Sequence, residues 1–82
     1  LVESTVERLY RHDAKHRTEF VPTLQALVAN MGVRSKAAQA LFLHRNTLLL
    51  RIQRMEEITG CDLSRSETLL EMGMALRVRP ML

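Results

Sequence analysis

Four neighbouring residues carry the densest hydrogen-bonding chemistry in this chain: His44, Arg45, Asn46 and Thr47. Together they offer an imidazole, a guanidinium, an amide and a hydroxyl, which donate and accept hydrogen bonds in several geometries. A guanidinium can bind a phosphate or a guanine edge through two parallel bonds, and an asparagine amide can do the same with adenine. Three leucines follow directly. The segment therefore needs a polar partner on one side and a hydrophobic core on the other.

Basic residues occupy the middle of the sequence, and acidic residues are confined to the two flanks. The formal net charge is +3, and no Asp or Glu occurs between Glu19 and Glu56. The Lys and Arg residues in that interval are Arg34, Lys36, Arg45, Arg51 and Arg54. A basic centre of this kind indicates a polyanionic partner. Charge alone leaves a solvated face equally open.

Length and composition favour a single small all-α domain. The 82 residues are 46% hydrophobic and 26% charged, which is ordinary for a folded domain. Aromatic residues make up only 4%, while Leu, Ala, Met and Arg, which are good helix formers, are abundant. The chain begins with Leu, so we expect it to be a fragment of a longer protein.

Several classes of protein are disfavoured. The single cysteine, Cys61, allows neither an internal disulfide nor a four-cysteine zinc site, which fits the cytoplasm. No apolar run approaches the ~20 residues of a membrane span, and no export signal is visible, so we expect no membrane partner. His12 and His16 have a spacing that metal ligands use, but a solvated helix end is the more ordinary interpretation. We expect no cofactor and no enzymatic activity, because the sequence lacks the catalytic motifs.

Periodicity predicts five helices, of which the first two precede the basic centre. The first has an apolar stripe made of Val2, Val6, Leu9 and Tyr10, which the polar run HDAKHR at 12–17 breaks. The second begins near Thr18 or Glu19, tolerates Pro22 in its first turn, and ends at Gly32. The face expected to be buried consists of Phe20, Leu24, Leu27, Val28 and Met31.

The third and fourth helices are separated by a very short connection. Ser35 can cap a short alanine-rich helix over 36–41. Phe42 and Leu43 then form a tight apolar turn before a fourth helix over about 45–59, which Gly60 ends. Such a pair is a helix-turn-helix pattern, in which the second helix lies in the DNA major groove and the first braces it against the backbone.

A fifth helix is expected towards the end of the chain. Ser64 and Glu67 form an S-x-x-E capping box that would open this helix, and Pro80 would end it. Its apolar residues are Leu69, Leu70, Gly73, Met74 and Val78.

A helical wheel at 100° per residue separates the residues of the fourth helix into faces. The core side consists of Leu48, Ile52, Met55 and Thr59. The outward side consists of Asn46, Leu50, Gln53 and Glu57. One flank holds Arg45 and Leu49, and the other holds Thr47, Arg51 and Arg54. The polar first turn therefore faces outward, as DNA recognition requires.

These residues carry a resemblance to a known family. The run HRNTLLLRIQRMEEITGCDL, preceded by SKAAQAL, resembles the C-terminal DNA-binding domain of the PucR/CdaR family of bacterial transcriptional regulators. That family is similar to Fis-type helix-turn-helix domains, which are dimeric. The resemblance implies a lead-in helix or linker over 1–17 and a DNA-binding domain over 18–82. It also implies double-stranded DNA and a second copy as partners, with a sensory region N-terminal to this domain.

Carried over by position, the resemblance implies DNA-binding roles for His44, Arg45, Asn46, Thr47, Arg51 and Arg54. Three residues at the start of the preceding helix, Arg34, Ser35 and Lys36, join the expected DNA-binding set because positive charge, a hydroxyl and backbone N–H groups there favour a phosphate. The set is completed by Leu49, Leu50 and Gln53 on the outward face and flank of the fourth helix. This sequence has Leu49 and Leu50 where the family commonly has Arg and Tyr, and Gln53 at a position that is often basic.

Each role has an alternative interpretation. Asn46 suits an adenine edge and a helix N-cap about equally, and Ser35 could be only a cap. The two arginines further along, Arg51 and Arg54, could bind the DNA backbone or pair with glutamates. Arg45 is disfavoured electrostatically at a helix N-terminus, which favours a functional role for it.

Two functions of different classes remain. The first is a sequence-specific, dimeric DNA-binding domain with its recognition helix over about 45–59 in the major groove. The second is a helical protein-interaction or dimerisation module that keeps the fold but no longer binds DNA. The exposed pair Leu49 and Leu50 could contact thymine methyl groups, but a protein interface is the more ordinary role for such leucines.

Overall fold

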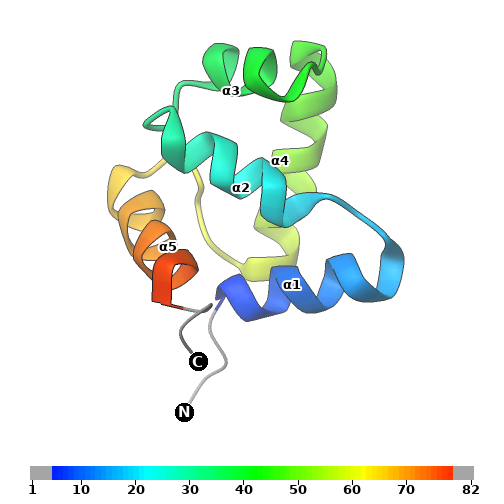
Figure 1. The fold of residues 1–82 in the computed structure, drawn as a ribbon, viewed down its shortest axis with the longest axis vertical. Coiled ribbons are helices and arrows are strands. Elements are labelled where there is room, and N and C mark those ends of the chain that lie inside the picture. The colour runs from blue at the N-terminus through cyan, green and yellow to red at the C-terminus, as the bar shows by residue number, and fades with distance from the viewer. Residues whose placement is uncertain (1–4, 79–82) are drawn as a thin grey trace.

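The computed structural model describes residues 5–78 and contains five helices (Figure 1). They are α1 (Thr5–His16), α2 (Phe20–Ala29), α3 (Arg34–Leu41), α4 (Arg45–Thr59) and α5 (Ser66–Val78). The expected all-α fold with a helix-turn-helix is therefore confirmed. None of these helices is long and apolar enough to cross a lipid bilayer. The predicted roles of Val2 and Pro80 lie outside the described residues.

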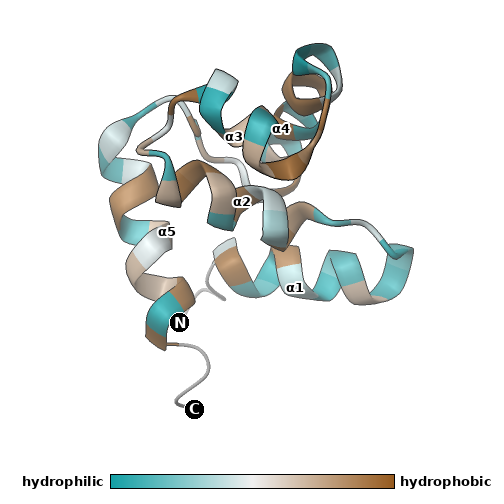
Figure 2. Ribbon diagram, turned by 45° about the horizontal axis from the view of Figure 1, so that its top comes forward, coloured by the Kyte–Doolittle hydropathy of each residue, from teal (hydrophilic) through white to brown (hydrophobic). Residues whose placement is uncertain are grey.

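Helix α2 lies at the centre of the molecule and contacts each of the other four helices. Figure 2 shows hydrophobic residues along much of α2, whereas α1 is mostly hydrophilic. The core around α2 draws on every helix and on one loop residue, Leu63. It consists of Val6, Leu9, Phe20, Val21, Leu24, Leu27, Ala37, Ala38, Leu48, Ile52, Met55, Leu63, Leu69 and Met72.

The polar run at 12–17 interrupts the apolar stripe of α1 without ending the helix, which continues to His16. Within this run a tertiary contact joins α1 to α2. The N-cap of α2, Glu19, makes no side-chain cap bond, and Asp13 of α1 supplies this cap instead. Its carboxylate accepts hydrogen bonds from the backbone N–H groups of Phe20 and Val21 at 2.9 and 2.8 Å. Helix α1 is thereby joined to the rest of the fold.

Gly60 ends α4, as expected, with a φ of +71°, whereas α2 ends three residues before Gly32, whose φ is +81°. Met31, however, was predicted to be buried and is 89% exposed. Helix α2 ends at Ala29, and Met31 lies beyond it with a left-handed φ of 55°. Its side chain therefore leaves the apolar face of the helix, so that prediction was wrong.

Both serine caps predicted from the sequence were wrong. Helix α3 begins at Arg34, one residue before Ser35, and its N-cap Val33 makes no side-chain cap bond. Helix α5 begins at Ser66, two residues after the expected cap. The hydroxyl of Ser64 instead donates to Asp62 at 2.6 Å, which folds the loop before the helix. Short polar side chains can bond to nearby groups in either arrangement, so the motif did not settle the boundary.

The buried face of α5 also differs from the prediction. Leu69 and Gly73 are buried as expected, and Met72 joins them. Leu70, Met74 and Val78 are 67%, 60% and 53% exposed. At Gly73 the helix approaches α2 so closely that an added Cβ would lie 2.9 Å from Val28 Cγ1. This close approach fixes the rotation of α5 about its axis, so that residues 70, 74 and 78 face away from the core.

Candidate nucleic-acid interface

Helices α3 and α4 are joined by three residues that form a compact turn. Phe42 has a left-handed φ of 57° and its N–H donates to Gln39 O at 3.1 Å. The N–H of Leu43 donates to Ala38 O at 2.9 Å. These two bonds define a Schellman motif, which ends α3 abruptly. The N-terminus of α4 therefore lies beside the end of α3, along one edge of the molecule (Figure 1).

His44 caps helix α4. Its backbone is extended, and its Nδ1 accepts a hydrogen bond of 3.1 Å from the N–H of Asn46. The interpretation of Asn46 as the N-cap is thus wrong, because Asn46 is the second residue of the helix. The side chain of Asn46 is exposed and does not cap the helix. The first turn of α4 presents Arg45, Asn46 and Thr47 to solvent.

The opposite face of α4 anchors it in the core, as the helical wheel predicted. Leu48 and Met55 are completely buried, Ile52 is 2% exposed and Thr59 is 5% exposed. On the outward face Leu50 is 64% exposed, and Gln53 is exposed as well. On the flank, Leu49 is 37% exposed.

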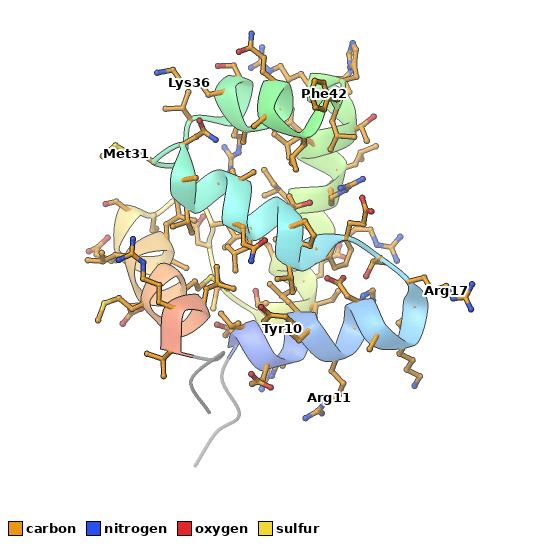
Figure 3. The ribbon with its side chains drawn as sticks, viewed as in Figure 1. Tyr10, Arg11, Arg17, Met31, Lys36 and Phe42 are labelled. Atoms are coloured by element: carbon orange, nitrogen blue, oxygen red, sulfur yellow. The ribbon has the colours of Figure 1, made fainter. Side chains whose placement is uncertain are left out.

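Helix α3 begins at the same edge of the molecule, and Figure 3 shows Lys36 near its start and Phe42 near its end. Ser35 and Lys36 are exposed in the first turn. Arg34 is half-buried, and its Nε is buried without a hydrogen-bond partner among the described residues. Free N–H groups and positive charge at a helix start favour an anion.

Arg51 contacts α2, whereas Arg54 lies at the surface. The Arg51 side chain is 21% exposed, and its Nη1 donates to Thr23 Oγ1 at 3.1 Å and lies 3.9 Å from Glu19 Oε1. This matches the glutamate-pairing interpretation. Arg54 is exposed, and its charge helps to lower the pKa of His12 in α1, so it lies on the α1 side of α4. Within residues 5–78, Arg54 makes no ion pair with Glu57.

Phe42 was expected only to fill an apolar turn, yet its side chain is 96% exposed. The exposure of Phe42 was not predicted from the sequence. The position of this residue could have indicated its exposure, because the residue that ends a helix often has a left-handed φ and an aromatic residue is unusual there.

The histidines of α1 do not form a metal site with other residues of the described chain. The rings of His12 and His16 lie 4.5 Å apart between centroids, and no group of three potential ligands occurs within residues 5–78. His12 instead stacks on Phe20 at 5.0 Å, and its Nδ1 lies 2.9 Å from Thr18 Oγ1.

A short helix, a Schellman turn and an anchored helix with an exposed polar first turn define a helix-turn-helix DNA-binding domain. The PucR C-terminal helix-turn-helix domain family matches residues 20–78, and this chain belongs to that family. It is a family of regulator domains that are typically non-enzymatic.

Two curated proteins of Bacillus subtilis (strain 168) are similar to this chain. The proline-responsive transcriptional activator PutR is 40% identical over 52 residues, which are 63% of this chain and 13% of PutR. The purine catabolism regulatory protein is 38% identical over 45 residues, which are 55% of this chain and 8% of that protein. The chain thus corresponds to a small part of either relative. No solved structure gave a significant match.

Proposed function

We propose that this chain binds specific sequences of double-stranded DNA by placing the N-terminal half of α4 in the major groove. The groove accepts one α-helix, and its base edges differ in hydrogen-bonding pattern. Arg45 and Asn46 would contact base edges. Lys36 and Ser35, together with the N–H groups that begin α3, would hold a phosphate.

The observation that carries this proposal is the position of the first turn of α4. Arg45, Asn46 and Thr47 are all exposed, while Leu48, one residue later, is completely buried. The helix is therefore fixed in the domain immediately behind its polar end. A rigid polar end needs little ordering when it binds, which favours recognition.

Electrostatics supports the same surface. No acidic residue lies between Phe20 and Met55, the interval that contains all of α2 and α3 and most of α4. A phosphate backbone approaching the α3–α4 edge would meet Arg34, Lys36 and Arg45 without an acid from those segments. Arg51 acts differently in this proposal, because its guanidinium supports α4 against α2.

We expect the bound form to be a homodimer with two α4 helices about one DNA turn apart, which would match a two-fold symmetric site. The relatives named above are several times longer than this chain, and one is named a proline-responsive transcriptional activator. A sensory region N-terminal to residues 1–17 and a cytoplasmic location accord with such a regulator. The DNA-binding domain would span 18–82, with α1 packed against it as the lead-in helix.

Fluorescence anisotropy tests the proposal. A duplex from the region upstream of the gene for this chain is titrated at several salt concentrations. With about four or five phosphates neutralised, log K should fall against log[salt] with a slope of roughly −4. Arg45→Ala should weaken binding about tenfold or more and reduce discrimination between duplexes. Arg77→Ala is the matched control, because it removes an exposed arginine from the far end of α5 (Figure 1). Equal effects of the two variants would rule out this use of α4.

The alternative is a protein-interaction module, and the exposure of Leu50 at 64% favours it. Such a module would self-associate tightly and would bind no duplex at low salt. In that case Leu50→Lys would dissociate the assembly, which sedimentation velocity detects. In a DNA-binding domain the same variant would leave the assembly intact and alter duplex affinity.

A further inference from the structure

Phe42 combines two unfavourable features. Its φ of 57° lies in the left-handed region, which L-residues other than Asn and Asp seldom adopt. Its side chain is 96% exposed, so the phenyl ring packs against almost nothing within the domain. Glycine or asparagine would form the same Schellman turn with less strain and without exposing an apolar ring.

The position of Phe42 relates it to the candidate interface. It lies two residues before His44, the residue that caps α4, and three before Arg45. It also ends α3, whose start carries Lys36, and Figure 3 shows Lys36 and Phe42 towards the two ends of that helix. A duplex that contacts the start of α3 and the first turn of α4 would also meet the turn between them.

We propose that the Phe42 ring contacts DNA directly, as an apolar partner of the thymine methyl groups at the edge of the major groove. This inference rests on the proposed function. A phenyl ring has no hydrogen-bonding group, so it must contact an apolar part of the duplex. The methyl group at C5 of thymine is the apolar group that the major groove presents, and the deoxyribose is the other apolar surface nearby. Phe42 would thus add a preference for thymine beside the bases that Arg45 and Asn46 contact.

The domain contains a closely matched control for this residue. Met31 also follows a helix end, has a φ of 55° and is 89% exposed. Its turn has the same pair of bonds, from Met31 N–H to Val28 O and from Gly32 N–H to Leu27 O. Met31 lies on the side of α5, where it lines a surface hollow with Val28, Leu69 and Leu70, and not in the turn between α3 and α4 (Figure 3). Phe42→Asn and Met31→Asn therefore make the same chemical change in the same backbone conformation.

The experiment measures duplex affinity and thermal stability of both variants in the 82-residue chain, using the upstream duplex described above. We expect Phe42→Asn to lower affinity roughly tenfold, from the loss of apolar contact area. We expect Met31→Asn to change affinity less than twofold. Neither variant should melt below the unsubstituted chain, because Asn tolerates the left-handed region. A purely structural role for Phe42 would instead lower the melting temperature and leave the affinity of the folded protein unchanged.

A duplex with deoxyuridine in place of thymidine identifies the group that Phe42 contacts. If the ring contacts thymine methyl groups, the unsubstituted chain binds the deoxyuridine duplex more weakly than the thymidine duplex. Phe42→Asn, which lacks the ring, should then bind the two duplexes with equal affinity. If Phe42→Asn binds both duplexes weakly and the unsubstituted chain binds both equally, the ring contacts deoxyribose. That outcome supports the direct DNA contact and overturns its assignment to thymine.

Three outcomes would overturn the proposal. If the unsubstituted chain binds the duplex in a salt-dependent way and Phe42→Asn binds it with equal affinity, the ring does not contact DNA. The proposed function would then stand without this inference. A change from dimer to monomer in Phe42→Asn, seen by sedimentation without DNA, would assign the ring to a second copy. Failure of the unsubstituted chain to bind any duplex at low salt would overturn the proposed function and this inference together.

Discussion

Arg51 in α4 donates a hydrogen bond of 3.1 Å to the hydroxyl of Thr23 in α2, 28 residues away. Thr23 is completely buried, and its hydroxyl donates in turn to the carbonyl oxygen of Glu19 at 2.7 Å. The Glu19 carboxylate lies 3.9 Å from the same Arg51 nitrogen. This chain of contacts joins the proposed recognition helix to the beginning of the central helix, so an arginine in the basic centre serves the fold.

Replacing Arg51 should therefore affect stability more than DNA binding. We expect Arg51→Gln to lower the free energy of unfolding by about 1 kcal/mol, the usual contribution of one hydrogen bond. The slope of log K against log[salt] should not change. Arg45→Gln should do the opposite, with unchanged stability and weaker, less selective duplex binding, because Arg45 is proposed to contact base edges. Urea denaturation and anisotropy distinguish the two. A reduced slope in Arg51→Gln would mean that Arg51 turns to a phosphate in the complex.

Asp13 should contribute more to stability than Glu19, the residue at the N-cap position of α2. Its carboxylate accepts from two backbone N–H groups and from the hydroxyl of Thr18. An asparagine amide nitrogen cannot accept a hydrogen bond, so Asp13→Asn leaves a donor unpaired. We expect a loss of about 1–3 kcal/mol in the free energy of unfolding. Glu19→Gln is the control, because its exposed carboxylate makes no cap bond, and it should cost about 0.5 kcal/mol or less. Similar losses would contradict the assignment of Asp13 as the cap.

Stability should fall at acidic pH because of His12. Burial lowers the pKa of its imidazole, the charges of His16 and Arg54 lower it further, and Asp13 opposes them. In the unfolded chain the pKa of His12 is about 6.5, so near and below that pH the unfolded chain binds more protons than the folded one. The contribution of His12 to the free energy of unfolding is therefore complete above about pH 6.5 and is lost as pH falls through the lower pKa of the folded state. Thermal melts from pH 8 to 5 should show this decline, and His12→Gln should flatten it. An unchanged pH profile in the variant would exclude His12 as its source.

Gly73 should be difficult to replace because of Val28. An alanine Cβ would lie 2.9 Å from Val28 Cγ1, and a valine side chain has little rotational freedom. Overpacking costs about 1–3 kcal/mol, which the better helix propensity of alanine offsets by about 1 kcal/mol. We therefore expect Gly73→Ala to be destabilising by about 1 kcal/mol. In a Val28→Ala background the same change should be neutral or stabilising, as denaturant titrations would show. Additive effects of the two changes would mean that α5 moves freely relative to α2.

The faces of α4 could be predicted because they depend on local geometry. Leu48, Ile52 and Met55 recur at the helical period, and one face of a helix must enter the core of a small domain. The exposure of Asn46, Leu50 and Gln53 follows from the same period. The helix-turn-helix pattern followed from the short distance between two helical segments. Which of these exposed residues contact DNA stays a prediction.

Contacts between residues distant in sequence could not be predicted in this way. Local motifs suggested that Ser35, Asn46 and Ser64 would cap helices, but a cap needs only a suitably placed acceptor. The structure uses His44 for α4, and for α2 it uses Asp13, which belongs to another helix. No sequence period relates Asp13 to the end it caps.

The order of helices, their approximate bounds and the polar first turn of α4 are determined by the sequence itself, because periodicity and composition act over a few residues. The tertiary structure decided which apolar residues of α5 are buried, since the close approach of Gly73 to Val28 sets the rotation of that helix. It also decided that Arg51 turns inward to Thr23 while Phe42 stays in solvent. Both outcomes depend on how neighbouring helices pack, and packing joins residues that no local pattern connects.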